Sequence, residues 1–521
     1  MHLSPLDMVC FTAYCLGLFG LAWWVSREKP GYKKNTEDYF LAGKSLPWWA
    51  VGTSLIAANI SAEQIIGMSG SGFAIGLAIA SYEWMSAITL ILVARYFIPI
   101  FLKTGIYTMP QFLEQRFDRR VRLVMAVFWL GVYILVNLTS VLYLGALAIN
   151  TVTGLDMIYG LAFLAVFSIG YSIYGGLKAV ALTDSLQVTL LILGGLLVTY
   201  LALDRISDGQ GALTGFAVLN REVPEKFDMI LSADSPHYMS LPGLSVLLGG
   251  LWVMNISYWG FNQYITQRAL AAKSLAEAQK GIALAAFLKL LMPLIVVVPG
   301  IAAALLAPDI GKPDQAYPEM MKLVPAGLLG ICFAALVAAI ASSLGSMSNS
   351  ISTIFTFDIY KTLINPNASQ GQQVLVGRVM ALLSMLIAAL VCRPLLGELK
   401  QAFQYIQEFT GFFTPGIVAI FLLGFFWKRA TAHSALAAAI ASAVLSLLFK
   451  LFWPALPFMD RVGLVFILCI AIAVCVTLIE GSGEQRNAID LKEVEYSTSR
   501  GFNLSALAIT LILIGFYATW W

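Results

Sequence analysis

Two charged residues, Glu83 and Lys289, lie deep inside apolar stretches of this 521-residue chain. An isolated charge in a membrane-spanning segment costs at least about 2.5 kcal/mol, so each side chain should find a partner or a polar ligand. A carboxylate accepts hydrogen bonds and an ammonium donates them, so together they could bind the polar groups of a solute. Ser86 follows Glu83 by three residues and shares its helical face. A purely structural ion pair is the alternative.

Side-chain amides form a second group of polar residues within apolar stretches: Asn59, Gln64, Asn255, Gln401, Gln404 and Gln407. Amides offer both donors and acceptors, which match the hydroxyl groups of a sugar. The nearby aromatic residues Tyr82, Tyr258 and Phe403 could cover the apolar face of a pyranose ring. A hexose is therefore a natural ligand, and hydrogen bonding between helices is the alternative for each amide.

Oxygen atoms suited to a small, hard cation occur at two places. Ser342 and Ser343 are adjacent in an alanine-rich stretch, where serine hydroxyls most often bond back to the preceding turn. Unwound backbone carbonyls at Ala57 and Ile60 could complete a cage for Na⁺, by analogy with the oxygen ligands of other hard ions. Such a cage requires no carboxylate.

These residues belong to apolar stretches of about 20 residues that recur along the chain, each long enough to cross a bilayer. Hydrophobic residues make up 59% of the chain and charged residues 12%, whereas soluble proteins have about 25% charged residues. A water-soluble enzyme is excluded, and a net charge of +3 gives no support to a nucleic-acid partner. We predict an all-α polytopic membrane protein, a single domain over 1–521 with about 14 transmembrane helices.

Two predicted spans, 47–73 and 242–272, carry polar interruptions at the depth where a lipid-spanning helix should be most apolar. Irregular segments are tolerated there only if they line a protein cavity. Both spans contain Asn-Ile-Ser, and they are five spans apart, which inverts their orientation. We expect two inverted-topology repeats with a site between their broken helices. The expected division is 47–201 and 242–427 for the repeats, with peripheral spans at 6–26 and 430–520. The first repeat should end with two separate spans, 158–174 and 179–201, and the second with a single span, 399–427.

Lysine and arginine gather in the loops that follow the odd-numbered spans, which places those loops in the cytoplasm. Both termini should then face outward, together with the acidic loop 204–240. No nucleophile–base pair or metal-ligand cluster stands out, because His2, His237 and His433 are far apart in the sequence. We therefore expect no enzymatic activity.

Five runs of residues resemble the sodium/solute symporter family, most closely its bacterial sodium/galactose (sodium/glucose) transporters: Glu37–Lys44, Ala57–Gln64, Ser81–Ser86, Tyr171–Gly176 and Gln401–Glu408. The resemblance covers essentially the whole chain. It implies a five-plus-five inverted-repeat (LeuT-type) core with discontinuous helices, and inward cotransport of a hexose with Na⁺ by alternating access. It also implies a multi-pass protein of the bacterial inner membrane.

The resemblance assigns a Na⁺ site to five residues: the carbonyls of Ala57, Ile60 and Ala339 and the hydroxyls of Ser342 and Ser343. Asp184 resembles an acidic residue that the family places on the sodium exit path. Its alternative role is that of an ordinary interfacial charge near Lys178.

The same resemblance assigns the sugar site to Gln64, Glu83, Ser86, Asn255, Lys289 and Gln407. Tyr258 would stack on the pyranose as the inner gate, held in part by Asn59. Ser257 precedes it where the resemblance would place a second tyrosine, so the flanking contact should differ. The outer hydrophobic plug would consist of Met68, Tyr82 and Phe403.

Two alternatives remain open. One keeps the fold and changes the cargo to inositol, proline or another small solute. The other is a sugar-responsive sensor or channel without stoichiometric uptake. The expected partners are galactose or glucose, Na⁺ and the lipid bilayer, with a monomer or a dimer as the assembly.

Overall fold

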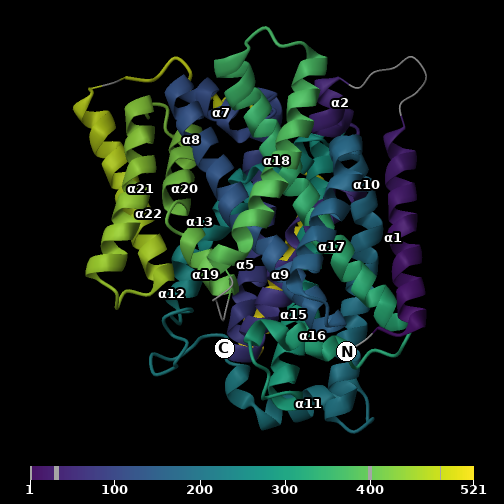
Figure 1. Cartoon of the computed structure of the whole chain (residues 1–521). Helices are drawn as coiled ribbons and strands as arrows, with labels where there is room; N and C mark the ends of the chain where they lie inside the picture. Colours follow the sequence, from purple (N-terminus) through teal and green to yellow (C-terminus); the bar gives the residue numbers. More distant parts are fainter. Residues whose placement is uncertain (1–2, 28–34, 397–401, 482) are drawn as a thin grey trace.

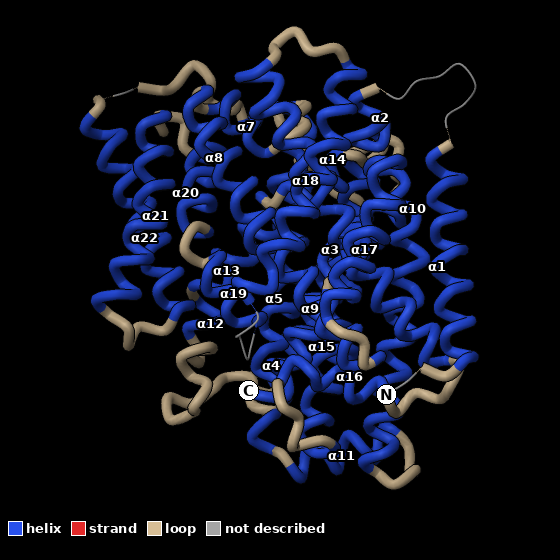
Figure 2. The backbone as a smooth tube through the Cα atoms, viewed as in Figure 1, coloured by secondary structure: helices blue, strands red, loops and turns tan. Residues whose placement is uncertain are grey.

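The computed structural model describes residues 3–27, 35–396, 402–481 and 483–521. Within these ranges the chain is built of helices, and the only β contact is an isolated parallel bridge between Leu46 and Ala272. Ten helices are long and apolar enough to cross a membrane, and Met157–Gly170 and Thr414–Phe426 are shorter apolar helices. Figures 1 and 2 show them packed side by side. The predicted all-α, multi-pass membrane architecture is confirmed.

Most spans are long helices that begin at a capping side chain. Ser274, for example, accepts a hydrogen bond from the backbone of Glu277, which satisfies one of the free amides at the helix start. The apolar windows of the first and last helices are only 11% and 17% buried, as expected for helices that face lipid. The long helices are α1 (Pro5–Ser26), α15 (Leu275–Leu306), α17 (Leu328–Ile354), α18 (Gln370–Leu396), α21 (Ala432–Phe452), α22 (Phe458–Ile479) and α23 (Arg500–Thr519).

Other spans contain a stretch of π-helix, a wider turn that is frequent at functional sites. One span consists of α5 (Ser81–Leu92), η4 (Val93–Phe97) and α6 (Ile98–Thr104). The next consists of α8 (Arg119–Val132), η5 (Tyr133–Leu138) and α9 (Thr139–Thr153). The π-helical segment η9 (Phe355–Ile364) continues α17.

Both predicted interruptions are breaks in the helices. The first span consists of α3 (Trp48–Asn59), η2 (Glu63–Met68) and α4 (Ser69–Ala74), and it breaks at Ile60, whose ψ of 84° is not helical. The second consists of α12 (Ser245–Leu248), α13 (Gly250–Ile256), η7 (Ser257–Phe261) and α14 (Gln263–Leu270). Whether these spans are related as inverted repeats stays a prediction.

Two boundaries differ from those expected. The span predicted at 399–427 is divided into α19 (Ala402–Thr410) and α20 (Thr414–Phe426), where Pro415 starts the second helix. The predicted spans 158–174 and 179–201 are joined in one helical run, α10 (Met157–Ile206). The intervening glycines do not end it, because glycine weakens a helix interior without blocking it as proline does.

Small residues let α15 lie directly against the first broken span. A Cβ atom on Gly300 would lie 2.1 Å from the carbonyl oxygen of Ser69, and one on Gly52 would lie 2.6 Å from that of Gly281. Neither position has room for a side chain, so the helix backbones are in close contact. This packing fixes α15, which carries Lys289, beside α3 and α4.

The isolated bridge ties the start of the first broken span to the end of the second. The Leu46 amide donates to the carbonyl of Ala271 at 3.1 Å, and the Lys273 amide donates to the carbonyl of Leu46 at 3.1 Å. These hydrogen bonds connect segments more than 200 residues apart in the sequence.

Both ends of the chain lie on one side of the helices, together with α11 (Ala212–Glu222) of the acidic loop (Figure 1). The short helices α2 (Thr36–Leu41) and α7 (Met109–Arg116) lie on the opposite side. This arrangement agrees with the expected grouping of termini and loops. Which side is cytoplasmic stays a prediction of the lysine and arginine distribution.

Candidate functional site

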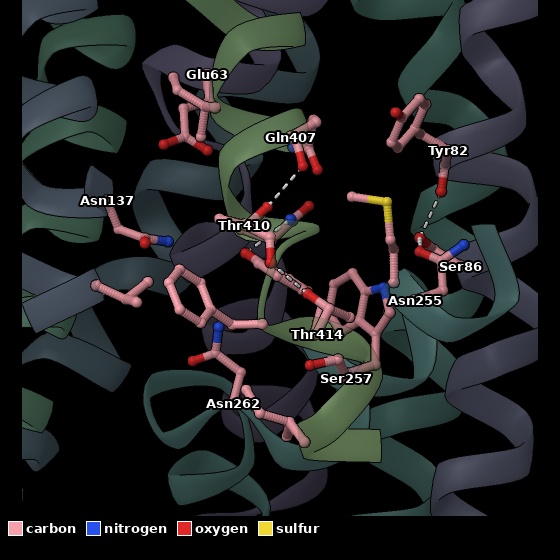
Figure 3. Close-up of a pocket in the computed structure, with 18 of the residues that line it drawn as sticks. Glu63, Tyr82, Ser86, Asn137, Asn255, Ser257, Asn262, Gln407, Thr410 and Thr414 are labelled. Atoms are coloured by element: carbon pink, nitrogen blue, oxygen red, sulfur yellow. Dashed lines mark hydrogen bonds between the residues drawn. The ribbon is translucent and has the colours of Figure 1, made fainter. Parts of the chain in front are cut away.

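A cavity lies between the two broken spans, α5, η5 and the α19–α20 pair (Figure 3). It brings together residues from five separate parts of the sequence. Of the predicted sugar-site residues, those that line it are Gln64, Glu83, Ser86, Asn255 and Gln407. The predicted gate residues that line it are Asn59, Met68, Tyr82, Tyr258 and Phe403.

Lys289 lies behind the cavity wall. Its ammonium forms a buried ion pair with Glu83 and also donates to the side-chain carbonyl of Asn59. The same ammonium stands 5.0 Å from the ring centroid of Trp259, within range of a cation–π interaction. Glu83 therefore borders the cavity, and Lys289 compensates its charge from behind. The structural ion pair and the cavity-facing carboxylate, which the sequence offered as alternatives, occur together.

Ser86 and Asn255 form one side of the cavity wall. The Ser86 hydroxyl donates to the Asn255 side-chain oxygen at 2.9 Å and to the Tyr82 carbonyl at 2.6 Å. The Asn255 amide nitrogen has no hydrogen-bond partner among the described residues. A buried donor without a partner is costly, so this nitrogen is suited to an acceptor on a bound solute.

Aromatic side chains flank the polar groups. The Tyr258 hydroxyl accepts hydrogen bonds from Asn59 at 3.0 Å and from the Tyr264 hydroxyl at 3.1 Å. The rings of Tyr82 and Phe403 meet edge to face with centroids 5.4 Å apart. Gly67 makes this contact possible, because a Cβ atom there would lie 2.9 Å from the Cβ of Phe403.

The predicted sodium ligands lie where the break in α3 meets α17. The Ser343 hydroxyl donates to the carbonyls of Ala57 at 3.2 Å and Ala58 at 3.3 Å. The last carbonyls of α3 and a serine of α17 are therefore in direct contact. The remaining predicted ligands are also buried: Ile60 at the end of α3, and Ala339 and Ser342 in α17. Hydroxyl and carbonyl oxygens of this kind suit Na⁺.

Asp184 is fully buried next to Ser342, so it is not an ordinary interfacial charge near Lys178. It accepts hydrogen bonds from the hydroxyls of Ser342 and, at 2.5 Å, of Ser54. The guanidinium of Arg268 lies 3.8 Å away and donates to the hydroxyls of Ser54, at 2.7 Å, and of Ser346. The network joins α3, α10, α14 and α17.

Some cavity residues were absent from the predicted site. They include Glu63, Asn137, Asn262, Thr410 and Thr414. Glu63 directly precedes Gln64 and is an ionisable residue in a membrane span, which is the signal that could have identified it. Asn137 is an isolated amide in the middle of a long apolar span and gives a weaker signal.

Three glutamines of the predicted amide group, Gln401, Gln404 and Gln407, differ in where they lie. Gln407 lines the cavity, whereas neither amide atom of Gln404 has a hydrogen-bond partner among the described residues. Gln401 and the side chains of residues 171–176 lie outside the described residues.

Comparison with known proteins establishes the family. The family model of the sodium:solute symporter family matches residues 39–442. The chain belongs to this family. A sodium/glucose cotransporter of Vibrio parahaemolyticus is 50% identical to this symporter over 538 aligned residues, covering 100% of this chain and 99% of that protein.

More distant relatives are also sodium-coupled transporters. A human sodium/myo-inositol cotransporter is 34% identical to this symporter, over 83% of this chain and 64% of that protein. The solved substrate-bound, outward-open structure of a Na⁺-coupled sialic acid symporter matches with a TM-score of 0.80, over 91% of this chain and 98% of that one, at 22% identity. This symporter therefore shares that fold. It is a transporter rather than an enzyme, and Na⁺ is its co-transported ion.

Proposed function

We propose that this symporter imports a hexose, galactose or glucose, together with Na⁺ by alternating access. One observation carries the proposal. The break in α3 supplies both the carbonyl of Ala57, which contacts Ser343, and the cavity-lining side chain of Asn59. An ion and a sugar bound at these places would act on the same broken helix. The 50% identity to a sodium/glucose cotransporter over the full chain supports a hexose as cargo.

In this proposal the sugar occupies the cavity beside Glu83. Its hydroxyls donate to the Glu83 carboxylate and accept from the free amide nitrogen of Asn255. Gln64, Ser86 and Gln407 supply further hydrogen bonds, while Lys289 pairs with Glu83 from behind. Tyr258 stacks on the pyranose ring as the inner gate, and Met68, Tyr82 and Phe403 close the outer side.

Sodium couples to the sugar through the conformation of the first broken span. We assign Na⁺ to the carbonyls of Ala57, Ile60 and Ala339 and the hydroxyls of Ser342 and Ser343. The ion would join α3 to α17 and favour the conformer in which Asn59 and Gln64 are placed for sugar. Two ligands couple only through their different affinities for the conformers, so loss of Na⁺ on the inner side would also weaken sugar binding. Asp184, which contacts Ser342, would lie on the exit path.

The finer architecture belongs to the same proposal. Spans 47–201 and 242–427 would form the inverted repeats of a core with about 14 helices in total. Both termini would face the periplasm of a bacterial inner membrane, in keeping with the bacterial relative.

The decisive experiment is uptake of labelled galactose into proteoliposomes under an inward Na⁺ gradient, with K⁺ replacing Na⁺ as the control. Uphill accumulation that requires Na⁺ supports symport, whereas equilibration without accumulation would indicate a channel or sensor. Competition by glucose, inositol and proline then identifies the cargo. Inositol is a specific rival because the human relative is a sodium/myo-inositol cotransporter. Gln64→Ala should raise the KM for sugar, and Gln210→Ala, on the exposed outer loop, should leave it unchanged.

The ion site has its own variant. Ser343→Ala removes a hydroxyl ligand, which should raise the Na⁺ concentration for half-maximal uptake by roughly tenfold, equivalent to about 1.4 kcal/mol. Ser384→Ala is the matched control, because that buried hydroxyl donates only to the Ala381 carbonyl of its own helix. Unchanged sodium dependence in Ser343→Ala would show that the ion binds elsewhere.

A further inference from the structure

Glu63 is a buried carboxylate in the cavity wall that the proposed sugar and sodium sites do not use. It is the first residue of η2, three residues after the break at Ile60, and is 7% exposed. Figure 3 shows Glu63 and Asn137 on one side of the cavity, with Tyr82, Ser86 and Asn255 on the other. Glu63 therefore faces the cavity from the wall opposite Ser86.

The charge of Glu63 has no counterpart. The cavity-lining carboxylates are Glu63 and Glu83, and Glu83 is paired with Lys289. Glu63 accepts one hydrogen bond, from the Ser140 hydroxyl at 2.5 Å, and forms no ion pair within the described part of the chain. A neutral sugar cannot offset this charge. Burial of an unpaired carboxylate is strongly unfavourable, so the site must take up a positive charge when the carboxyl is ionised.

Two side chains of the neighbouring span, Asn137 and Ser140, carry oxygen atoms that could bind a cation together with Glu63. Asn137, in η5, is 7% exposed and lines the cavity, and its side-chain oxygen has no hydrogen-bond partner among the described residues. Ser140 follows one turn later and also donates to the Asn137 carbonyl at 2.9 Å. Glu63 is thus hydrogen-bonded to Ser140 of the neighbouring span, and the unpartnered oxygen of Asn137, one turn before Ser140, belongs to the same side of the cavity (Figure 3). Hard monovalent and divalent cations prefer such ligands.

We propose that Glu63, Asn137 and Ser140 form a second Na⁺ position in the cavity wall, separate from the site at Ser342 and Ser343. The ion neutralises Glu63 and uses the unpartnered oxygen of Asn137. Since η2 begins immediately after the unwound part of α3, an ion here acts on the same broken span as the transported Na⁺. The position serves either as a second bound ion or as a station for Na⁺ passing through the cavity.

Equilibrium binding of ²²Na⁺ to the purified full-length protein, without sugar and with choline as the balancing cation, tests the proposal. The wild type should bind two ions per chain. At a Na⁺ concentration that just saturates the wild type, Glu63→Gln and Ser343→Ala should each lose most of one bound ion, and the double variant most of both. Glu225→Gln, in the loop outside the membrane, is the matched carboxylate control and should bind two. Size-exclusion elution and thermal unfolding report whether each variant is folded.

A second pair of variants separates ion binding from a merely structural role of Glu63. Asn137→Asp adds a carboxylate beside Glu63 and should tighten the second Na⁺ by tenfold or more. Asn137→Leu removes a ligand and should weaken it by a similar factor. An unchanged Na⁺ affinity in both variants overturns the proposal.

The two sites fail independently. If Glu63→Gln binds as many ions as the wild type, Glu63 carries a proton instead of Na⁺, and the second position is wrong. If Ser343→Ala alone leaves the count unchanged, the sodium site of the proposed function is wrong and the Glu63 position stands.

Discussion

Two ion pairs buried among the helices of this symporter are constructed differently. Lys289 contacts Glu83 directly, and the pair borders the cavity through its carboxylate. Asp184 instead accepts hydrogen bonds from two serine hydroxyls, while the guanidinium of Arg268 stands 3.8 Å away. Asp184, Arg268 and Lys289 are fully buried, and Glu83 is 3% exposed.

The difference separates a binding role from a connecting role. The carboxylate of Glu83, beside the cavity, is paired with one ammonium, so its remaining acceptor capacity is available to a ligand. Both oxygens of the Asp184 carboxylate accept hydrogen bonds from serines, Ser54 in α3 and Ser342 in α17, and Arg268 completes the network. A buried pair gains little net stability, but loss of one partner leaves a costly unpaired charge. The comparison therefore predicts different consequences for removing each cation.

The largest effect should follow loss of the ammonium at the cavity. Lys289→Met leaves Glu83 buried without a cation and should lower the free energy of unfolding by about 3–5 kcal/mol and abolish uptake. Combining it with Glu83→Gln should restore most of the stability but not the uptake. Denaturant unfolding in detergent and uptake in proteoliposomes measure the two effects.

Lys280→Met is the control for that prediction. Lys280 pairs with Glu277 at 3.5 Å on an exposed part of α15. Exposed pairs contribute about 1 kcal/mol or less. If Lys289→Met lowers the free energy of unfolding no more than Lys280→Met does, Glu83 does not depend on Lys289 for its charge partner.

Loss of the guanidinium should be milder and should act on the ion. Arg268→Gln leaves Asp184 with its serine donors, so we expect a loss of about 1.5–3 kcal/mol, typical of hydrogen bonds to charged groups. Because Asp184 contacts Ser342, the Na⁺ concentration for half-maximal uptake should change more than the KM for sugar. Arg268→Lys, which keeps the charge, should recover part of the loss. If the Na⁺ concentration for half-maximal uptake and the KM for sugar change equally, the Asp184–Arg268 pair does not act mainly on the ion.

Removal of one hydroxyl should have a smaller effect. Tyr258→Phe deletes the acceptor of the hydrogen bonds from Asn59 and Tyr264, at a cost of about 1 kcal/mol. Since Asn59 also accepts from Lys289, the variant tests whether the gate stabilises the cavity pair. Sugar KM should rise while sodium dependence stays near that of the wild type. Tyr238→Phe, outside the membrane, is the control.

The smallest effect concerns a lysine that binds backbone carbonyls and lies close to a histidine. In the loop 204–240, Lys226 donates to the carbonyls of Phe73 at 2.9 Å and Ala74 at 3.1 Å, at the end of α4. Burial and the charge of Lys226 lower the pKa of His237 below its ordinary value of 6.5, although a backbone hydrogen bond at Ala74 opposes this.

A lowered pKa means that the folded protein binds the His237 proton less readily than the unfolded chain does. Stability should therefore be constant above pH 6.5 and fall as the pH drops below it. His237→Gln should remove this part of the pH dependence, measured by thermal unfolding between pH 5 and pH 8. A variant with the wild-type pH profile would exclude His237 as its source.

The helices were largely predictable because hydrocarbon requires long apolar stretches of backbone that satisfy their own hydrogen bonds. The breaks near Ile60 and Asn262 were signalled by polar residues at midmembrane depth. The break between α19 and α20 could not be read from Pro415, which starts α20, because proline does not always break a helix. Pro293, for example, lies inside the uninterrupted α15. A proline alone does not reveal whether neighbouring helices can accommodate it.

The site was predicted in part for a similar reason. Glu83 and Asn255 stand out as polar residues in apolar surroundings, and both line the cavity. The location of Lys289 behind the wall depends on how α15 packs on α3, which sequence spacing does not give. Glu63 and Asn137 lie in π-helical segments. Their directions therefore depart from a 3.6-residue repeat, and simple periodicity does not find them.

The backbone bridge between Leu46 and Ala272 has a mechanical consequence. Two hydrogen bonds pin the entrance of the first broken span to the exit of the second. The two spans are therefore joined through their backbones outside the cavity. In the proposed mechanism, a movement of the first span on ion binding would act through this bridge on the second span, which carries Asn255 and Tyr258, without requiring a bound solute.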